Sequence, residues 1–166
     1  MKLSLLIPVF NESRTLPKIL DKLSGIDLPG IEIETVFVDD ASSDDSAEIA
    51  AKWAAGRKNA RLIRHDKNKG KGAAVRTALH AATGDIVVIQ DADMEYDPED
   101  FPALIKPIQE NQADIVFGSR NLTPNPRYSL IFYWGNLMLN AVVFLLYGKY
   151  VTDMETCYKM MRRQIF

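Results

Sequence analysis

The segment VVIQDADMEYDP, residues 87–98, carries the pattern that decides the fold. Its first three residues are apolar and β-branched, which predicts a short buried strand. Carboxylates then follow at every second position, as Asp91, Asp93, Glu95 and Asp97. Carboxylates this close together repel one another, so they gather where a cation lies between them or where they cap a turn. The segments on either side show what such a strand belongs to.

Apolar runs and amphipathic segments alternate along the chain. Strands are predicted at residues 2–10, 31–40, 60–65, 85–93 and 113–120, and helices at residues 11–25, 42–56, 72–84 and 98–111. Strands that alternate with helices imply an α/β fold with a mostly parallel central sheet and right-handed crossovers. Without a linker, a low-complexity segment or a repeat, residues 1–166 are expected to form a single domain.

Composition limits the possible partners. The chain has 166 residues, 47% of them hydrophobic, and a net charge of −2. It is long enough to bury a sizeable core, and its charge gives no general attraction to nucleic acid, so no nucleic-acid partner is expected. The one cysteine, Cys157, cannot form an internal disulfide, which fits a reducing compartment.

Residues 128–148 contain no charged side chain. About twenty apolar residues are enough to span a bilayer, so a transmembrane helix is one interpretation. Asn136 and Asn140 interrupt the run, however, and both amides would need partners inside the membrane. The other interpretation is an interfacial or groove-forming helix, which we favour.

Ligands of parallel α/β sheets bind beyond the carboxyl ends of the strands, and here the acids follow those ends. In an extended backbone, residues two apart point the same way, so Asp91, Asp93 and Glu95 are expected to converge on one point. Hard carboxylate oxygens suit Mg²⁺ or Mn²⁺, which is usually shared with phosphates. The alternative is an acidic turn that caps the helix beginning at Pro98.

Two further groups follow strand ends. Glu12 and the pair Asp39 and Asp40 are placed to accept hydrogen bonds from a base or a ribose, or else to cap the helices that follow. The segment HDKNKGKG, residues 65–72, precedes a predicted helix, whose free N–H groups favour an anion. It lacks the spacing of a Walker A loop, and the alternative is a solvated basic turn.

Arg120 ends the fifth predicted strand, and Arg127 comes just before the uncharged segment. Guanidinium groups pair well with phosphate. Arginines between strand-end acids and an apolar helix indicate a phosphate that carries an apolar tail, although surface arginines in a loop are the alternative. His65 and His80 lie off the strand ends, and no Ser/His/Asp order or zinc-ligand spacing occurs. We therefore expect chemistry that needs a metal and acids but no covalent intermediate.

Six motifs now form a recognisable series: PVFNE, VDD, NKGKGAAV, DADME, GSR and TDMETCYK. In order and spacing the chain resembles the inverting family 2 glycosyltransferases, and most of all the polyprenyl-phosphate hexosyltransferases, of which dolichyl-phosphate mannose synthase is the best known. The resemblance covers essentially the whole chain. It implies the GT-A fold, a Rossmann-like three-layer sandwich, and a chain truncated at its C-terminus, because full-length relatives continue further.

The resemblance also implies roles for individual residues. The nucleotide-sugar pocket would be lined by Pro8, Val9, Glu12, Asp39, Lys71, Asp91 and Ala92. A divalent metal, Mg²⁺ or Mn²⁺, would be held by Asp91, Asp93 and Glu95. The catalytic residues would be Asp93, Arg120 and Asp153. The acceptor phosphate would be bound by Arg120 and Arg127.

The implied reaction is the inverting transfer of a hexose from GDP-mannose or UDP-glucose to a polyprenyl phosphate, by a peripheral protein on the cytoplasmic face of a membrane. This chain departs from the family at Glu95, where glutamine is frequent, and at Arg127, which does not align cleanly. Asp153 lies where relatives with hydroxyl acceptors carry a general base. Two alternatives therefore stay open: a saccharide hydroxyl acceptor with Asp153 as the base, and a non-catalytic fragment that binds the nucleotide sugar.

Overall fold

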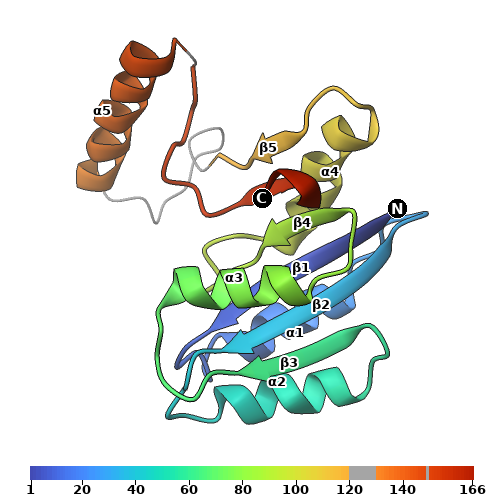
Figure 1. The fold of residues 1–166 in the computed structure, drawn as a ribbon. Helices are drawn as coiled ribbons and strands as arrows, with labels where there is room; N and C mark the ends of the chain where they lie inside the picture. Colours follow the sequence, from blue (N-terminus) through green and yellow to red (C-terminus); the bar gives the residue numbers. More distant parts are fainter. Residues whose placement is uncertain (120–129, 149) are drawn as a thin grey trace.

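The computed structural model describes residues 1–119, 130–148 and 150–166. In this part of the chain, six strands form one sheet in the order β3-β2-β1-β4-β6-β5 (Figure 1). Their bounds are Lys2–Val9 for β1, Glu32–Asp39 for β2, Ala60–Arg64 for β3, Ile86–Ile89 for β4, Ile115–Phe117 for β5 and Lys159–Arg162 for β6. Strands β1 to β4 pair in parallel, whereas β6 is antiparallel to both β4 and β5. The mostly parallel sheet expected from the sequence is confirmed.

Helices cover the two faces of this sheet and make three layers (Figure 1). One face carries α1 (Leu16–Ser24), α2 (Ser46–Ala55) and α4 (Phe101–Gln109), and a short 3-10 turn, η1 (Pro98–Asp100), leads into α4. The other face carries α3 (Lys71–Ala81). A second 3-10 turn, η2 (Arg163–Ile165), follows β6. The predicted three-layer α/β architecture is therefore present.

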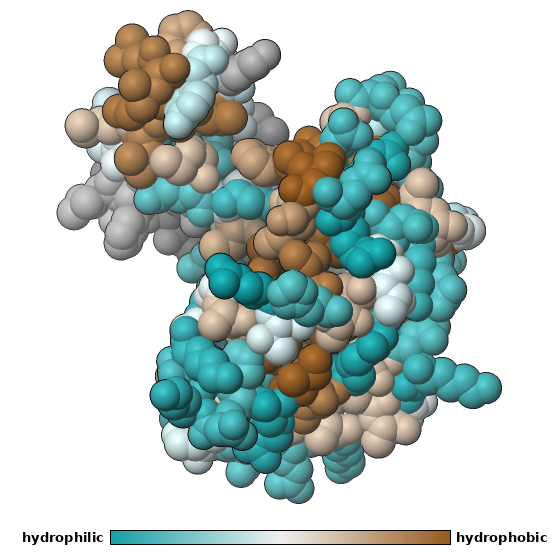
Figure 2. All heavy atoms as spheres, in the orientation of Figure 1, coloured by the Kyte–Doolittle hydropathy of each residue, from teal (hydrophilic) through white to brown (hydrophobic). Residues whose placement is uncertain are grey.

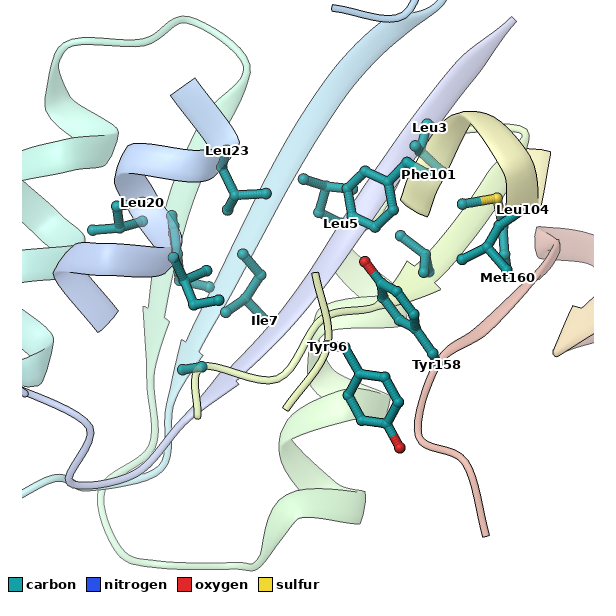
Figure 3. Packing of buried hydrophobic residues seen from close by; sticks show 14 of the residues in the cluster. Leu3, Leu5, Ile7, Leu20, Leu23, Tyr96, Phe101, Leu104, Tyr158 and Met160 are labelled. Atoms are coloured by element: carbon teal, nitrogen blue, oxygen red, sulfur yellow. The ribbon is translucent and has the colours of Figure 1, made fainter. Parts of the chain in front are cut away.

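The core lies on both sides of β1. Leu3, Leu5 and Ile7 face the layer of α1 and α4 and belong to one buried cluster with Phe101 and Tyr158 (Figure 3). Leu6 points to the opposite face, toward α3. A central parallel strand with helices on both faces has no solvated side, which is why its sequence is apolar at nearly every position.

The register of the parallel strands brings their carboxyl ends to one edge of the sheet. Val9 of β1 pairs with Asp39 of β2, and Leu6 of β1 pairs with Ile89 of β4. The segments that follow these three strands therefore meet at the same edge. These are the segments that carry Glu12, Asp40 and the acids after Ile89.

A buried carboxylate on β2 is hydrogen-bonded to β1 and to the loop before β4. Glu34 of β2 is fully buried and accepts hydrogen bonds from Ser4 Oγ (2.5 Å) and from Thr83 N (2.8 Å), and it pairs with Arg61. Burial raises the pKa of Glu34, but these hydrogen bonds and Arg61 outweigh it and hold the pKa below its ordinary value. Nothing in the local pattern around residue 34 indicated this network.

Helix α5 (Leu130–Tyr147) stands apart from the sheet (Figure 1). The two asparagines of the uncharged segment tie it to the loop before β6. Asn136 Nδ2 donates to Asp153, Asn140 Nδ2 donates to the Thr152 carbonyl (3.0 Å), and Asn140 Oδ1 accepts from Met154 N (2.9 Å). Among the described residues, no helix has the length and apolar character that a bilayer crossing requires.

Candidate functional site

A cleft of about 280 Å³ opens at the edge where the carboxyl ends of β1, β2 and β4 meet. Its walls come from the segments after those strands and from the start of α3: Pro8, Val9, Phe10, Glu12, Asp40, Asn68, Gly70, Lys71, Ala74, Asp91, Ala92 and Asp93. Six of the seven residues expected in a nucleotide-sugar pocket lie here, all except Asp39. Segments far apart in the sequence are thus brought to one site by the parallel register.

Asp39 is buried behind this wall, and its neighbour Asp40 lines the cleft instead. The Asp39 carboxylate accepts from Arg64 Nε (3.2 Å) and from Ser42 N (3.4 Å), so it is engaged by the end of β3 and by the loop after β2. Side chains of successive residues at a strand end point in opposite directions. The two aspartates therefore do not face the same space, and the structure does not place Asp39 among the residues that line the cleft.

Asp40 holds the turn that leads into α3. Its carboxylate accepts from the backbone N–H groups of Lys69 (3.0 Å) and Gly70 (2.7 Å), and it lies 2.6 Å from His65 Nδ1. Burial raises the pKa of Asp40, but the hydrogen bonds from His65, Lys69 and Gly70 outweigh it and keep the pKa below its ordinary value. Asp40 is thus a charged anchor at the wall of the cleft.

Lys71, the first residue of α3, reaches across the cleft to Asp91 after β4. Its ammonium lies 2.7 Å from Asp91 Oδ2 and 3.3 Å from Cys157 Sγ. Burial lowers the pKa of Lys71, but the hydrogen bond and the charge of Asp91 outweigh it and raise the pKa above its ordinary value. A cation and the free N–H groups at the start of α3 therefore face the same space, which favours an anionic ligand.

The acids after β4 do not converge as expected. The two-residue alternation holds only for extended backbone, whereas Met94 adopts a left-handed conformation with φ of 69°. Asp93 Oδ1 accepts from Glu95 N (2.9 Å), and Asp97 Oδ1 accepts from Glu99 N (3.1 Å) at the start of η1. Asp97 therefore caps a helix start, as the alternative interpretation predicted. Within the described ranges, no three His, Cys, Asp or Glu side chains are grouped as metal ligands.

The donor set nevertheless fits a metal that is shared with a ligand. Mg²⁺ usually binds through one or two carboxylates together with phosphate oxygens and waters, and it does not need a complete protein cage. Asp93 is exposed and lines the cleft, and Asp91 lines it beside Lys71. Glu95 is exposed on the same turn. One or two of these carboxylates would suffice to hold a metal that also binds an anionic ligand.

The residues just before β6 hydrogen-bond to the acidic turn that follows β4. The Tyr158 hydroxyl lies 3.0 Å from Gln90 Oε1 and 2.9 Å from the Asp97 carbonyl oxygen, and Cys157 N donates to the Tyr96 hydroxyl (2.9 Å). Figure 3 shows the rings of Tyr96 and Tyr158 next to each other. Their role was not evident from the sequence, because the contacts join residues about sixty positions apart.

The remaining predicted residues lie elsewhere. Asp153 is buried and bonded to Asn136, and it is not among the residues that line the cleft. Arg120 and Arg127, the predicted acceptor arginines, lie outside the described residues. Sequence reasoning also set His65 aside, although the structure buries it next to the cleft wall. His65 directly follows β3, so the expectation that it lies off the strand ends is wrong. Its place at the end of the predicted strand, five residues before the glycine that precedes α3, is the signal that could have drawn attention to it.

Two curated relatives are similar to this chain over most of its length. The chain is 38% identical over 120 residues to the dolichol-phosphate mannosyltransferase of Pyrococcus furiosus, a match that covers 72% of this chain and 33% of the relative. It is 31% identical over 166 residues to the undecaprenyl-phosphate 4-deoxy-4-formamido-L-arabinose transferase of Photorhabdus laumondii subsp. laumondii, covering 99% of this chain and 50% of the relative. This chain therefore spans half or less of either relative.

The fold has a close counterpart among solved structures. Glucosyl-3-phosphoglycerate synthase from Mycobacterium tuberculosis, solved in complex with Mn²⁺, UDP and glucosyl-3-phosphoglycerate, superposes with a TM-score of 0.74 at 23% identity, over 99% of this chain and 57% of the synthase. This likeness confirms the GT-A fold that the sequence resemblance implied. The model of the glycosyl transferase family 2 matches residues 4–166. The chain belongs to glycosyl transferase family 2.

Proposed function

We propose that this chain forms the donor-binding and catalytic part of an inverting glycosyltransferase, which transfers a hexose from GDP-mannose or UDP-glucose to a polyprenyl phosphate. The observation that carries the proposal is the cleft at the sheet edge, where Lys71 and the start of α3 face Asp91 and Asp93. The two relatives named for transfer to dolichol phosphate and undecaprenyl phosphate support the acceptor class.

The nucleotide would lie along the carboxyl ends of β1 and β2. Pro8 and Val9 offer apolar contacts at the end of β1, and Glu12 offers a carboxylate that accepts hydrogen bonds from base or ribose. The diphosphate would lie toward Lys71 and the unpaired N–H groups at the start of α3. Asp39, also expected in this pocket, would act through the loop that it holds and not by contact with the nucleotide.

A divalent cation, Mg²⁺ or Mn²⁺, would be held by the diphosphate and by one or two of the carboxylates Asp91, Asp93 and Glu95. Bound there, it would neutralise negative charge on the leaving nucleoside diphosphate. Mn²⁺ was present in the mycobacterial synthase of the same fold. Lys71 would stabilise the same charge from the other wall of the cleft, which makes the site electrostatically suited to departure of a diphosphate.

The reaction would be a single displacement at the anomeric carbon. A phosphate oxygen of the acceptor attacks, the bond from the anomeric carbon to the nucleoside diphosphate breaks, and the leaving diphosphate takes the electron pair, so the configuration inverts. An acceptor phosphate is already anionic and needs no general base. Asp153 would therefore orient groups at the acceptor side, and Arg120 and Arg127 would bind the acceptor phosphate.

The acceptor lipid lies in a membrane, and α5 offers a surface that fits one. Eight of its side chains are between 45% and 80% exposed and apolar or aromatic: Trp134, Leu137, Met138, Val142, Phe144, Leu145, Leu146 and Tyr147. Figure 2 shows the hydrophobic surface of this helix apart from the more polar body. We propose that α5 lies in the interface of the cytoplasmic leaflet, with the cleft on the water side.

The proposal is tested by following sugar transfer from GDP-mannose and UDP-glucose to undecaprenyl phosphate with Mn²⁺. Asp93→Ala should lower the transfer rate at least a hundredfold, because it removes the exposed carboxylate at the proposed metal. Asp21→Ala, which replaces an exposed aspartate on α1, is the matched control and should transfer at the wild-type rate. Wild-type transfer by Asp93→Ala would refute the proposal.

A further inference from the structure

His65 follows β3 and has no place in the proposed chemistry, yet it is fixed at both ring nitrogens. Its side chain is 6% exposed. Nδ1 lies 2.6 Å from Asp40 Oδ1, and Nε2 lies 2.9 Å from Thr77 Oγ1. A buried polar ring that leaves either nitrogen unpaired is costly, so the two partners specify one orientation of the ring. The imidazole therefore joins the end of β2 to the middle of α3.

The Asp40 carboxylate continues this connection to the turn before α3. The same Oδ1 that meets His65 accepts from Lys69 N (3.0 Å), and Oδ2 accepts from Gly70 N (2.7 Å). Gly70 has φ of 85°, a conformation that L side chains rarely adopt, and its carbonyl accepts from Ala74 N (3.1 Å) in the first turn of α3. Asp40 thus holds the turn just before α3, and His65 holds α3 itself at Thr77.

Asp40 and His65 thereby determine the position of the groups that the cleft presents to a ligand. Gly70, Lys71 and Ala74, all at the start of α3, line the cleft, and Lys71 crosses it to Asp91. A shift of the α3 terminus would move the Lys71 ammonium and the free N–H groups together. His65 is not among the residues that line the cleft, and both of its nitrogens are already engaged, so it does not contact a ligand there.

We infer that His65 is a positioning residue for the donor site: through Asp40 and Thr77 it fixes the start of α3 where Lys71 and the helix N–H groups meet the diphosphate. This inference rests on the proposed function for the identity of the ligand. The placement of the α3 terminus itself rests only on the hydrogen bonds of Asp40 and His65.

The experiment compares four variants of this chain with the wild type. His65→Leu removes both polar contacts. His65→Asn keeps an N–H donor near the Nδ1 position and so restores the contact with Asp40. Thr77→Val removes only the second contact. His80→Leu is the matched control, because His80 is the other histidine of the chain and lies exposed on α3. Circular dichroism establishes that each variant is folded.

Two measurements are made on each variant. NMR follows hydrogen exchange at the amides of Lys69 and Gly70, with the amide of Leu20 in α1 as a reference for global opening. Calorimetry follows binding of UDP-glucose and GDP-mannose with Mn²⁺. We expect His65→Leu to speed exchange at both amides and to weaken donor binding about tenfold. His65→Asn should recover most of both effects, and His80→Leu should behave as wild type.

Unchanged exchange at Lys69 and Gly70 in His65→Leu would overturn the inference, as would faster exchange with wild-type donor affinity. Failure of His65→Asn to recover either effect would also overturn it, because a purely steric role would then suffice. If the wild-type chain binds neither donor, the proposed function fails, and the exchange measurement alone decides whether His65 holds the α3 terminus.

Discussion

At the scale of single residues, the pair of Lys71 and Asp91 is the most informative contact in the cleft. Asp91 is nearly buried, and the ammonium of Lys71 lies 2.7 Å from it. About half of the Lys71 side chain is exposed, so solvent screens the pair and its contribution to folding stability is small. The importance of Lys71 lies in the positive charge that its ammonium presents to a ligand.

We therefore predict that Lys71→Met weakens binding of the donor nucleotide about tenfold or more, because a diphosphate loses a charge-assisted partner. The melting temperature should change by only a few degrees. Calorimetric titration with UDP-glucose and GDP-mannose and a thermal scan measure the two effects. Lys18→Met, which replaces an exposed lysine on α1, serves as the control. Unchanged affinity in Lys71→Met would remove Lys71 from the proposed site.

The residue scale is also where prediction from sequence was weakest. The structure places Glu12, Lys71, Asp91 and Ala92 at the cleft. The pattern of strand ends pointed to Glu12 and Asp91, because parallel strands place their ends together, whereas the family resemblance implied the pocket roles of Lys71 and Ala92. It did not distinguish Asp39 from Asp40, which requires the direction of each side chain at the strand end.

Turn geometry and long-range partners escaped prediction for a related reason. The extended backbone assumed after β4 fails at Met94, where φ is positive. The two partners of His65 lie 25 and 12 positions away along the chain, so no local pattern reveals them. Such features depend on tertiary neighbours that a single sequence does not specify.

At the scale of elements, the apolar runs were sufficient to predict β1 to β5, and the four predicted helices correspond to α1 to α4. The uncharged segment was harder to interpret, because its length and lack of charge suit a bilayer crossing whereas its two asparagines do not. The structure adds the direction of Asn136 and Asn140, which face the loop before β6. The antiparallel pairing of β6 was not predicted, because a short apolar run does not indicate the direction in which a strand pairs.

The exposed face of α5 leads to a prediction about membrane binding. Met138 and Leu145 are 71% and 80% exposed, and burial of each in a lipid interface contributes about 1.5–3 kcal/mol. The double substitution Met138→Glu and Leu145→Glu should therefore lower partitioning onto phospholipid vesicles at least tenfold, as measured by co-sedimentation. Ile165→Glu, which replaces an exposed residue of η2, should leave partitioning unchanged. Equal partitioning of the wild type and the double variant would contradict an interfacial role for α5.

At the scale of the whole molecule, carboxylates with lowered pKa values determine the response to acid. Glu34, Asp40, Asp44 and Asp97 have pKa values below their ordinary values of 4.5 for Glu and 3.8 for Asp, because hydrogen bonds and cations outweigh burial. A lowered pKa in the folded state stabilises the fold above the unfolded pKa, and this stability is lost as the pH falls through the folded value. Asp100 opposes the trend, since burial and the nearby acids Asp97 and Glu99 raise its pKa.

We predict that the melting temperature falls steeply only below about pH 4, where these carboxylates begin to take up protons. Asp44→Asn should flatten this fall, because the replacement cannot titrate. Its single amide oxygen keeps the bond from Ser46 N and loses the one from Ser13 N, which accept at different oxygens of Asp44, so the melting temperature at pH 7 should also be lower. Thermal scans by circular dichroism between pH 7 and pH 2.5 measure both slopes. The same acid dependence in Asp44→Asn and wild type would show that the Asp44 hydrogen bonds do not govern it.

The central claim is that the cleft binds a nucleotide sugar with a divalent metal. It is tested most directly by calorimetric titration of the folded chain with UDP-glucose and with GDP-mannose, each in Mn²⁺ and in EDTA. We predict that one donor binds in Mn²⁺ and that EDTA weakens this binding at least tenfold. A folded chain that binds neither donor would contradict the claim, and binding that is equal in Mn²⁺ and EDTA would contradict the role of the metal.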